Sequence, residues 1–208
     1  DMKDAVIVST ARTGIGKAGR GSLNLTHGAT MGGRVADVAV ERAGIDPALV
    51  EDSIWGCGYP EYVTGGNIAR QIVVRAGFPV SIAGTTVNRF CASGLDAVNI
   101  AASQIMSGQH DMTVGGGVES MSRVPMASDG GAWAMDPRTA LDTDFVPQGI
   151  SADLIATIEG FTRDDVDAYA VRSQDLAAKA TTGGYFAKSI VPVKDLNGLV
   201  VLDNDEHM

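Results

Sequence analysis

Cys91 is the residue of this sequence whose type and position best suit covalent chemistry. It lies between a predicted strand at residues 85–88 and a predicted helix at residues 95–106, in the segment Cys91-Ala92-Ser93-Gly94. At such a junction, unpaired backbone N–H groups and the positive end of the helix dipole favour a thiolate, the nucleophilic form of cysteine. The alternative is a packing role, because cysteine is small, apolar and often buried.

The second cysteine and the three histidines give no comparable signal. Cys57 follows a predicted strand between two glycines, and we expect it to pack in the core. His27, His110 and His207 do not stand at metal-ligand spacing from one another, from a cysteine or from a carboxylate. We therefore predict no metal site and no resident cofactor.

Two glycine-rich segments allow a binding role. Residues 14–19 match the pattern Gly-x-Gly-x-x-Gly, but they neither follow a strand directly nor open a helix, and Lys17 is not followed by Ser or Thr. A glycine-rich surface loop is favoured over a nucleotide site. Residues 115–122 permit close backbone approach, so this run either lines a pocket or makes a tight connection. Met121 is a candidate for an apolar pocket there, although core filling is the commoner role of methionine.

The elements that must position these residues follow from the apolar pattern of the first 120 residues. Strands are predicted at residues 5–8, 53–57, 85–88 and 112–115, and amphipathic helices at residues 26–43, 67–76 and 95–106. This alternation predicts βαβ units and an α/β fold, with a mostly parallel sheet covered by helices on both faces. The β-branched run at residues 5–8 is expected to be a buried strand.

The pattern changes after Glu119. Residues 121–149 hold three prolines and no clear period, which is typical of a long functional or disordered loop. A helix is expected from Thr162 to Ala180, and Asp165 provides the acid of a capping box. Two short strands are predicted at residues 190–193 and 199–202, the first at an edge because of Pro192.

Composition limits the classes of function. The chain has 208 residues, 45% of them apolar, and 16 Lys and Arg against 25 Asp and Glu give a formal charge of −9. This charge opposes binding to nucleic acid or to an anionic membrane surface, and no apolar run is long enough for a membrane span. Two cysteines cannot form a disulfide framework, so we expect a reducing, cytoplasmic compartment.

Four segments together resemble the thiolase family, the acyl-CoA acyltransferases that make or cleave a 3-ketoacyl-CoA. The segments are residues 11–17, 87–95, 116–122 and 162–180. The second is the most specific, since it matches the family's nucleophile motif Asn-x-x-Cys-x-Ser-Gly at a strand-to-helix junction. The resemblance implies a thiolase-like layered fold in which Cys91 forms an acyl-thioester intermediate and its backbone N–H donates to the oxyanion.

The resemblance covers only the family's first half. It implies that residues 1–120 form an incomplete N-terminal core domain and that residues 121–208 begin the inserted loop domain over the active site. A thiolase continues through a second core domain with a Gly-His-Pro histidine and a Cys-x-Gly cysteine, and neither motif occurs in this sequence. The expected partners are therefore the complementary C-terminal half and further copies, in a homodimer or tetramer, and this chain alone should be nearly inactive.

The resemblance also implies the substrates, CoA and acyl-CoA, with no separate cofactor. Met121, Gln148 and Gly149 are the candidate substrate-binding residues. Gly14 stands where Pro is usual in the family, and Pro147-Gln148-Gly149 stands where many members have His-Met-Gly. The second departure removes a histidine near the acyl thioester, and with the methionine-containing loop it favours a degradative, beta-oxidation enzyme with bulkier substrates.

Two other classes of function stay open at this stage. A non-catalytic thiolase-like protein would bind acyl-CoA or scaffold a complex, and rapid alkylation of Cys91 by iodoacetamide would argue against it. A dinucleotide-binding oxidoreductase would bind NADH and quench the fluorescence of Trp55 or Trp133. An absence of NADH binding would exclude that class.

Overall fold

The computed structural model describes residues 3–207, which form two compact units. The first unit combines the chain up to Ser128 with Ser189–His207, and the second spans Asp129–Lys188. The domain boundary expected between residues 120 and 121 concerns the complete family fold and stays a prediction.

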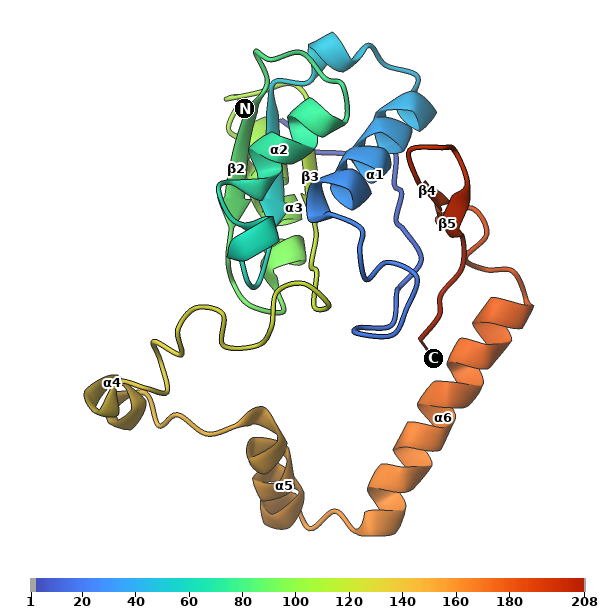
Figure 1. The fold of residues 1–208 in the computed structure, drawn as a ribbon. Coiled ribbons are helices and arrows are strands. Elements are labelled where there is room, and N and C mark those ends of the chain that lie inside the picture. The colour runs from blue at the N-terminus through green and yellow to red at the C-terminus, as the bar shows by residue number, and fades with distance from the viewer. Residues whose placement is uncertain (1–2, 208) are drawn as a thin grey trace. The chain divides into compact units, whose positions relative to one another are not determined.

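A three-stranded parallel sheet forms the centre of the first unit, in the order β2-β1-β3 (Figure 1). The strands are β1 (Asp52–Gly56), β2 (Ala83–Val87) and β3 (Thr113–Gly117). Gly56 pairs with Val87 on one side and with Gly117 on the other, so the three strands end at the same level. The predicted α/β class, a parallel sheet flanked by helices, is confirmed.

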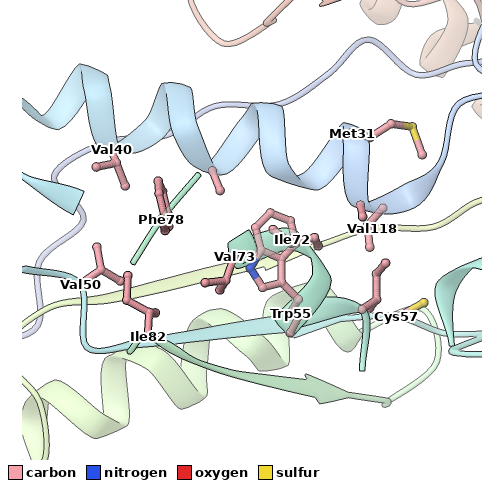
Figure 2. Close-up of a cluster of buried hydrophobic side chains, with 14 residues drawn as sticks. Met31, Val40, Val50, Trp55, Cys57, Ile72, Val73, Phe78, Ile82 and Val118 are labelled. Atoms are coloured by element: carbon pink, nitrogen blue, oxygen red, sulfur yellow. The ribbon is translucent and has the colours of Figure 1, made fainter. Parts of the chain in front are cut away.

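Helices cover both faces of this sheet because successive side chains of β1 point to opposite sides. Trp55 is buried in a cluster with side chains of α1 (Gly28–Ala43) and α2 (Ile68–Arg75), and Figure 2 shows it between α1 and the strands. Ile54 packs with Ala97 and Ala101 of α3 (Ser93–Met106) on the other face. The sheet therefore lies between α1 and α2 on one side and α3 on the other.

The second unit contains three helices, α4 (Pro137–Asp142), α5 (Gln148–Glu159) and α6 (Arg163–Thr182). The expected capping box is present, since Thr162 Oγ1 accepts the Asp165 N–H and the Asp165 carboxylate accepts the Thr162 N–H. The stretch 121–149 is less irregular than predicted, because Asp136 caps α4 within it and α5 begins at Gln148.

Shorter elements complete the fold. The strand predicted at residues 199–202 is confirmed as β5 (Val200–Leu202), which pairs antiparallel with β4 (Val193–Lys194). The strand predicted at residues 190–193 begins later than expected, since it shares only Val193 with β4. Two short 3-10 helices, η1 (Pro47–Leu49) and η2 (Tyr62–Thr64), come before and after β1 in the sequence. Every helix within residues 3–207 is too short or too polar to cross a bilayer.

The strand predicted at residues 5–8 is wrong in this structure. Val6 and Ile7 are each 76% exposed, and the segment is not part of a strand. A β-branched run becomes a strand only where a neighbouring strand accepts its backbone hydrogen bonds, and the sheet of the described residues ends at β2 and β3. The pattern identified an apolar extended segment without identifying its partner.

Candidate active site

The Cys91 turn, residues 88–93, joins the carboxyl end of β2 to the start of α3. Cys91 is exposed and comes two residues before the helix begins. Ala92 is the N-cap residue, with φ −89° and ψ 0°, and it makes no side-chain capping bond. An accessible thiol therefore lies at the positive end of a 14-residue helix.

Hydrogen bonds within the turn fix its path. Buried Ser93 accepts the Arg89 N–H at 2.8 Å and donates from its hydroxyl to the Phe90 carbonyl at 2.6 Å. Asn88 Oδ1 accepts the Phe90 N–H at 2.8 Å. Phe90 has a φ of 49°, a left-handed conformation that non-glycine residues rarely adopt. The Asn and Ser of the motif thus hold a strained residue immediately before Cys91.

An ion pair connects the start of the turn to the first turn of α3. Arg89 Nε lies 2.9 Å from a carboxylate oxygen of Asp96. Because the Arg89 side chain is 71% exposed, such a pair contributes only about 0–1 kcal/mol to stability. The pair thus links the start of the turn to α3 with little gain in stability.

Two glycines let α3 approach the ends of the strands. A Cβ on Gly56, the last residue of β1, would lie 2.2 Å from the carbonyl carbon and oxygen of Ser93. A Cβ on Gly117, the last residue of β3, would lie 3.1 Å from Gly94 Cα. Backbone therefore packs directly on backbone here, and Cys91 is placed at the carboxyl edge of the parallel sheet, where ligands of open α/β sheets bind.

The segments that follow β1 and β3 meet beside this turn. The Glu119 carboxylate accepts the Gly58 N–H at 2.7 Å, and its other oxygen lies 3.7 Å from Cys57 Sγ. Cys57 is 1% exposed and belongs to the apolar core, as its sequence context predicts. Burial, followed by the negative charge of Glu119, raises the pKa of the Cys57 thiol to about 11. Cys57 is thus a protonated core residue.

The other predicted site residues lie in both units. Met121 belongs to the first unit and is 63% exposed. Gln148 and Gly149 are the first two residues of α5 in the second unit, and both are exposed. Their role as substrate contacts with Cys91 stays a prediction. His27 caps α1 by accepting the Ala29 N–H at Nδ1, and within residues 3–207 no cluster of His, Cys, Asp and Glu could hold a metal ion.

The glycine-rich loop is held by two acids at the end of the chain, which the sequence reasoning missed. Asp205 makes two hydrogen bonds with the Arg12 guanidinium, at 2.7 and 2.9 Å, and accepts the Ile15 N–H at 2.8 Å. Glu206 accepts the N–H groups of Lys17 and Ser22. The Arg12 guanidinium, with the Ile15 N–H, holds the pKa of Asp205 below its usual range. The Ser22 hydroxyl, with the N–H groups of Lys17 and Ser22, does the same for the pKa of Glu206.

This acidic clamp, formed by Asp205 and Glu206 on the loop, accounts for Gly14 and Gly21 without a nucleotide. A Cβ on Gly14 would lie 2.1 Å from the Asn204 carbonyl oxygen, and one on Gly21 would lie 2.2 Å from a Glu206 carboxylate oxygen. N–H groups that a phosphate would need in a nucleotide site already donate to carboxylates. The pair of adjacent acids near the end of the sequence was the available signal, but nothing in the pattern connects it to a loop about 190 residues earlier.

Fold and site together define an α/β protein with an exposed cysteine at the carboxyl edge of a parallel sheet, on a turn that opens a helix. Comparison with known families is more specific. The family model "Thiolase, N-terminal domain" matches residues 5–208. This chain belongs to the thiolase family.

Curated relatives agree with this assignment. A 3-ketoacyl-CoA thiolase of Bacillus subtilis (strain 168) is 42% identical over 197 residues, covering 93% of this chain and 49% of that protein. An acetyl-CoA acetyltransferase of Syntrophomonas wolfei is 35% identical, covering 99% and 55%. A 3-oxoadipyl-CoA/3-oxo-5,6-dehydrosuberyl-CoA thiolase of Escherichia coli (strain K12) is 34% identical, covering 100% and 56%. The chain spans about half the length of these relatives.

Proposed function

We propose that this chain is the nucleophile-bearing half of an acyl-CoA acyltransferase of the thiolase type, and that Cys91 carries the acyl group. The observation that supports this most directly is the exposed Cys91 thiol on a hydrogen-bonded turn at the start of α3. It combines access for a thioester with the positive end of a helix dipole, and we assign the role of oxyanion donor to the backbone N–H of Cys91.

In the degradative direction, the Cys91 thiolate attacks the 3-keto carbonyl carbon of a 3-ketoacyl-CoA. The S–C bond forms, and collapse of the tetrahedral oxyanion breaks the bond between C2 and C3. The electron pair leaves on acetyl-CoA as an enolate, which takes up a proton. The CoA thiol then loses its proton and attacks the acyl-Cys91 carbonyl, which releases the shortened acyl-CoA and the Cys91 thiolate, so the kinetics are ping-pong. The reverse sequence is a Claisen condensation.

Both proton transfers need a general acid and base. The family resemblance assigns them to the histidine of a Gly-His-Pro motif and the cysteine of a Cys-x-Gly motif, which this sequence lacks. Loss of one such group costs about 10²- to 10⁴-fold in rate. We therefore propose that a complementary C-terminal half supplies these groups and completes the site, in a homodimer or tetramer. Residues 121–208 start a loop domain over the site, where Met121, Gln148 and Gly149 contact acyl-CoA. The complete protein is a cytoplasmic, degradative enzyme.

The test is the intact mass of the purified protein under denaturing conditions after brief incubation with acetyl-CoA. One acetyl group should appear on Cys91, together with the mass of a complementary chain or of a longer polypeptide. Cys91→Ala should remove the adduct, whereas Cys57→Ala should keep it, because Cys57 is buried. An unmodified Cys91 in a sample that contains the complementary chain or the longer polypeptide would refute the proposal, whereas a single unmodified 21.5 kDa species would mean an inactive half.

The alternative function is a thiolase-like protein that binds acyl-CoA or scaffolds a complex without turnover. Such a protein would bind CoA with a measurable heat in titration calorimetry and form no acyl adduct. The acetyl-CoA experiment separates the two functions.

A further inference from the structure

Glu119 lies where the ends of the three strands come together. It follows β3 by two residues, and its carboxylate accepts the Gly58 N–H from the segment that follows β1 at 2.7 Å. The second carboxylate oxygen lies 3.7 Å from the Cys57 thiol. Glu119 is itself exposed, so these contacts and not burial hold its carboxylate in place.

Gly58 in turn lies near Phe90, the residue that precedes the candidate nucleophile. A Cβ built on Gly58 would lie 2.9 Å from the bound Glu119 oxygen and 3.5 Å from the Phe90 carbonyl oxygen. That same Phe90 oxygen accepts the Ser93 hydroxyl at 2.6 Å and the Ser93 N–H at 3.1 Å. Glu119 thus fixes the Cys57-Gly58 segment beside the Phe90 carbonyl, one residue before Cys91.

The thiol beside Glu119 suits this contact. Because the pKa of Cys57 is raised to about 11, the thiol keeps its proton at neutral pH and donates weakly to the carboxylate. The carboxylate is then held by two donors from consecutive residues, a geometry that an amide oxygen or a shorter side chain cannot reproduce.

We infer that Glu119 is a positioning residue for Cys91, which acts by holding the Cys57-Gly58 segment in place beside the Phe90 carbonyl. The inference rests on the proposed acyl transfer at Cys91. Attack on a thioester needs the sulfur and the oxyanion donors in register, and a misplacement of about 1 Å can cost about 100-fold in rate. Alkylation by iodoacetamide needs only an accessible thiolate.

The test compares these two reactions in Glu119→Gln, on the protein as purified with any complementary chain present. S-acetylation of Cys91 by acetyl-CoA should slow by about 10- to 100-fold, while its alkylation rate stays within about twofold of the original protein. Glu41→Gln is the matched control, because it removes the same charge from an exposed residue of α1. It should change neither rate.

Gly58→Ala tests the same contact from the other side, since its Cβ would push on the Glu119 carboxylate. It should lower S-acetylation similarly, and the double variant should be no slower than the slower single variant, because both changes break one contact. Three outcomes would overturn the inference. The first is an acetylation rate in Glu119→Gln equal to that of the original protein. The others are a double variant in which the two losses of acetylation rate add, and alkylation of Cys57 in the variants. Failure of the original protein to acetylate would instead refute the proposed function.

Discussion

The two cysteines show how placement decides the chemistry of a residue. Both follow parallel strands at the same edge of the sheet, yet Cys57 is 1% exposed inside the core and Cys91 is exposed on the turn before α3. A core thiol such as that of Cys57 loses thiolate character because burial disfavours its charge. Residue type alone gave two candidates, and burial separates them.

This difference predicts selective alkylation. Iodoacetamide at neutral pH should label Cys91, whereas Cys57 should react at least about 100-fold more slowly, because it is inaccessible and, with a pKa of about 11, only about 10⁻⁴ of it is thiolate at pH 7. Peptide mapping by mass spectrometry measures both sites in one sample. Labelling in denaturant provides the control, since both cysteines should then react. Comparable native rates would show that Cys57 is not held in the core.

The sequence was sufficient for the local part of the candidate site and not for its supports. The Asn-x-x-Cys-x-Ser-Gly motif and the change from strand to helix placed Cys91 on a turn, which the structure contains. The ion pair of Arg89 with Asp96 could be expected from the sequence, because the two residues are close along the chain. The contacts of Glu119 with Gly58 and Cys57 were not, because they join residues about 60 positions apart that only the parallel pairing brings together.

At the scale of elements, the packing of α3 on the strand ends depends on the absence of side chains. Gly56→Ala should destabilise the first unit by about 1–3 kcal/mol, because its Cβ would overlap the Ser93 carbonyl and force α3 away from β1. Gly94→Ala is the control, since its Cβ would meet only Gly117 Cα at an ordinary 4.0 Å. Urea unfolding followed by circular dichroism measures both. An unchanged free energy of unfolding in Gly56→Ala would contradict this packing.

The elements themselves were predictable to different degrees. Helices α1 and α2 and the strand β1 between them have strong periods and clear stops, such as Gly44 with a φ of 68° after α1. The apolar run at residues 5–8 has an equally strong pattern but forms no strand, because strand formation depends on a partner that local sequence cannot specify. Periodicity therefore identifies which residues seek burial, and pairing decides which element they form.

At the scale of the whole molecule, the acids near the end of the chain hold a loop near its start. Their contribution depends on pH. The pKa of Asp205 is lowered, mainly by its hydrogen bonds with Arg12, so folding is favoured when Asp205 is ionised. This stabilisation is present above the pKa of the unfolded carboxyl and is lost as the pH falls through the lower pKa of the folded state.

Asp205→Asn should therefore lower the free energy of unfolding at pH 7 and reduce the difference between pH 7 and pH 3. Asp203→Asn, an exposed neighbour, is the matched control and should leave both quantities unchanged. Urea unfolding at the two pH values gives the measurement, and hydrogen exchange at Ile15, whose N–H donates to Asp205, locates the effect. An unaltered pH dependence in Asp205→Asn would show that the clamp does not form in solution.

The exposed apolar residues of the first unit have a consequence for association. Val6 and Ile7 are each 76% exposed and Leu95 is 67% exposed, and the run at residues 5–8 has no strand beside it. Such surface is unfavourable in water, whereas the formal charge of −9 opposes contact between copies.

The chain by itself should therefore associate in sedimentation velocity experiments, and more strongly at high salt, because salt screens the charge and leaves apolar contact intact. Addition of a complementary chain should replace this association with a defined complex. A monodisperse 21.5 kDa monomer at every salt and protein concentration would mean that the apolar surface needs no partner.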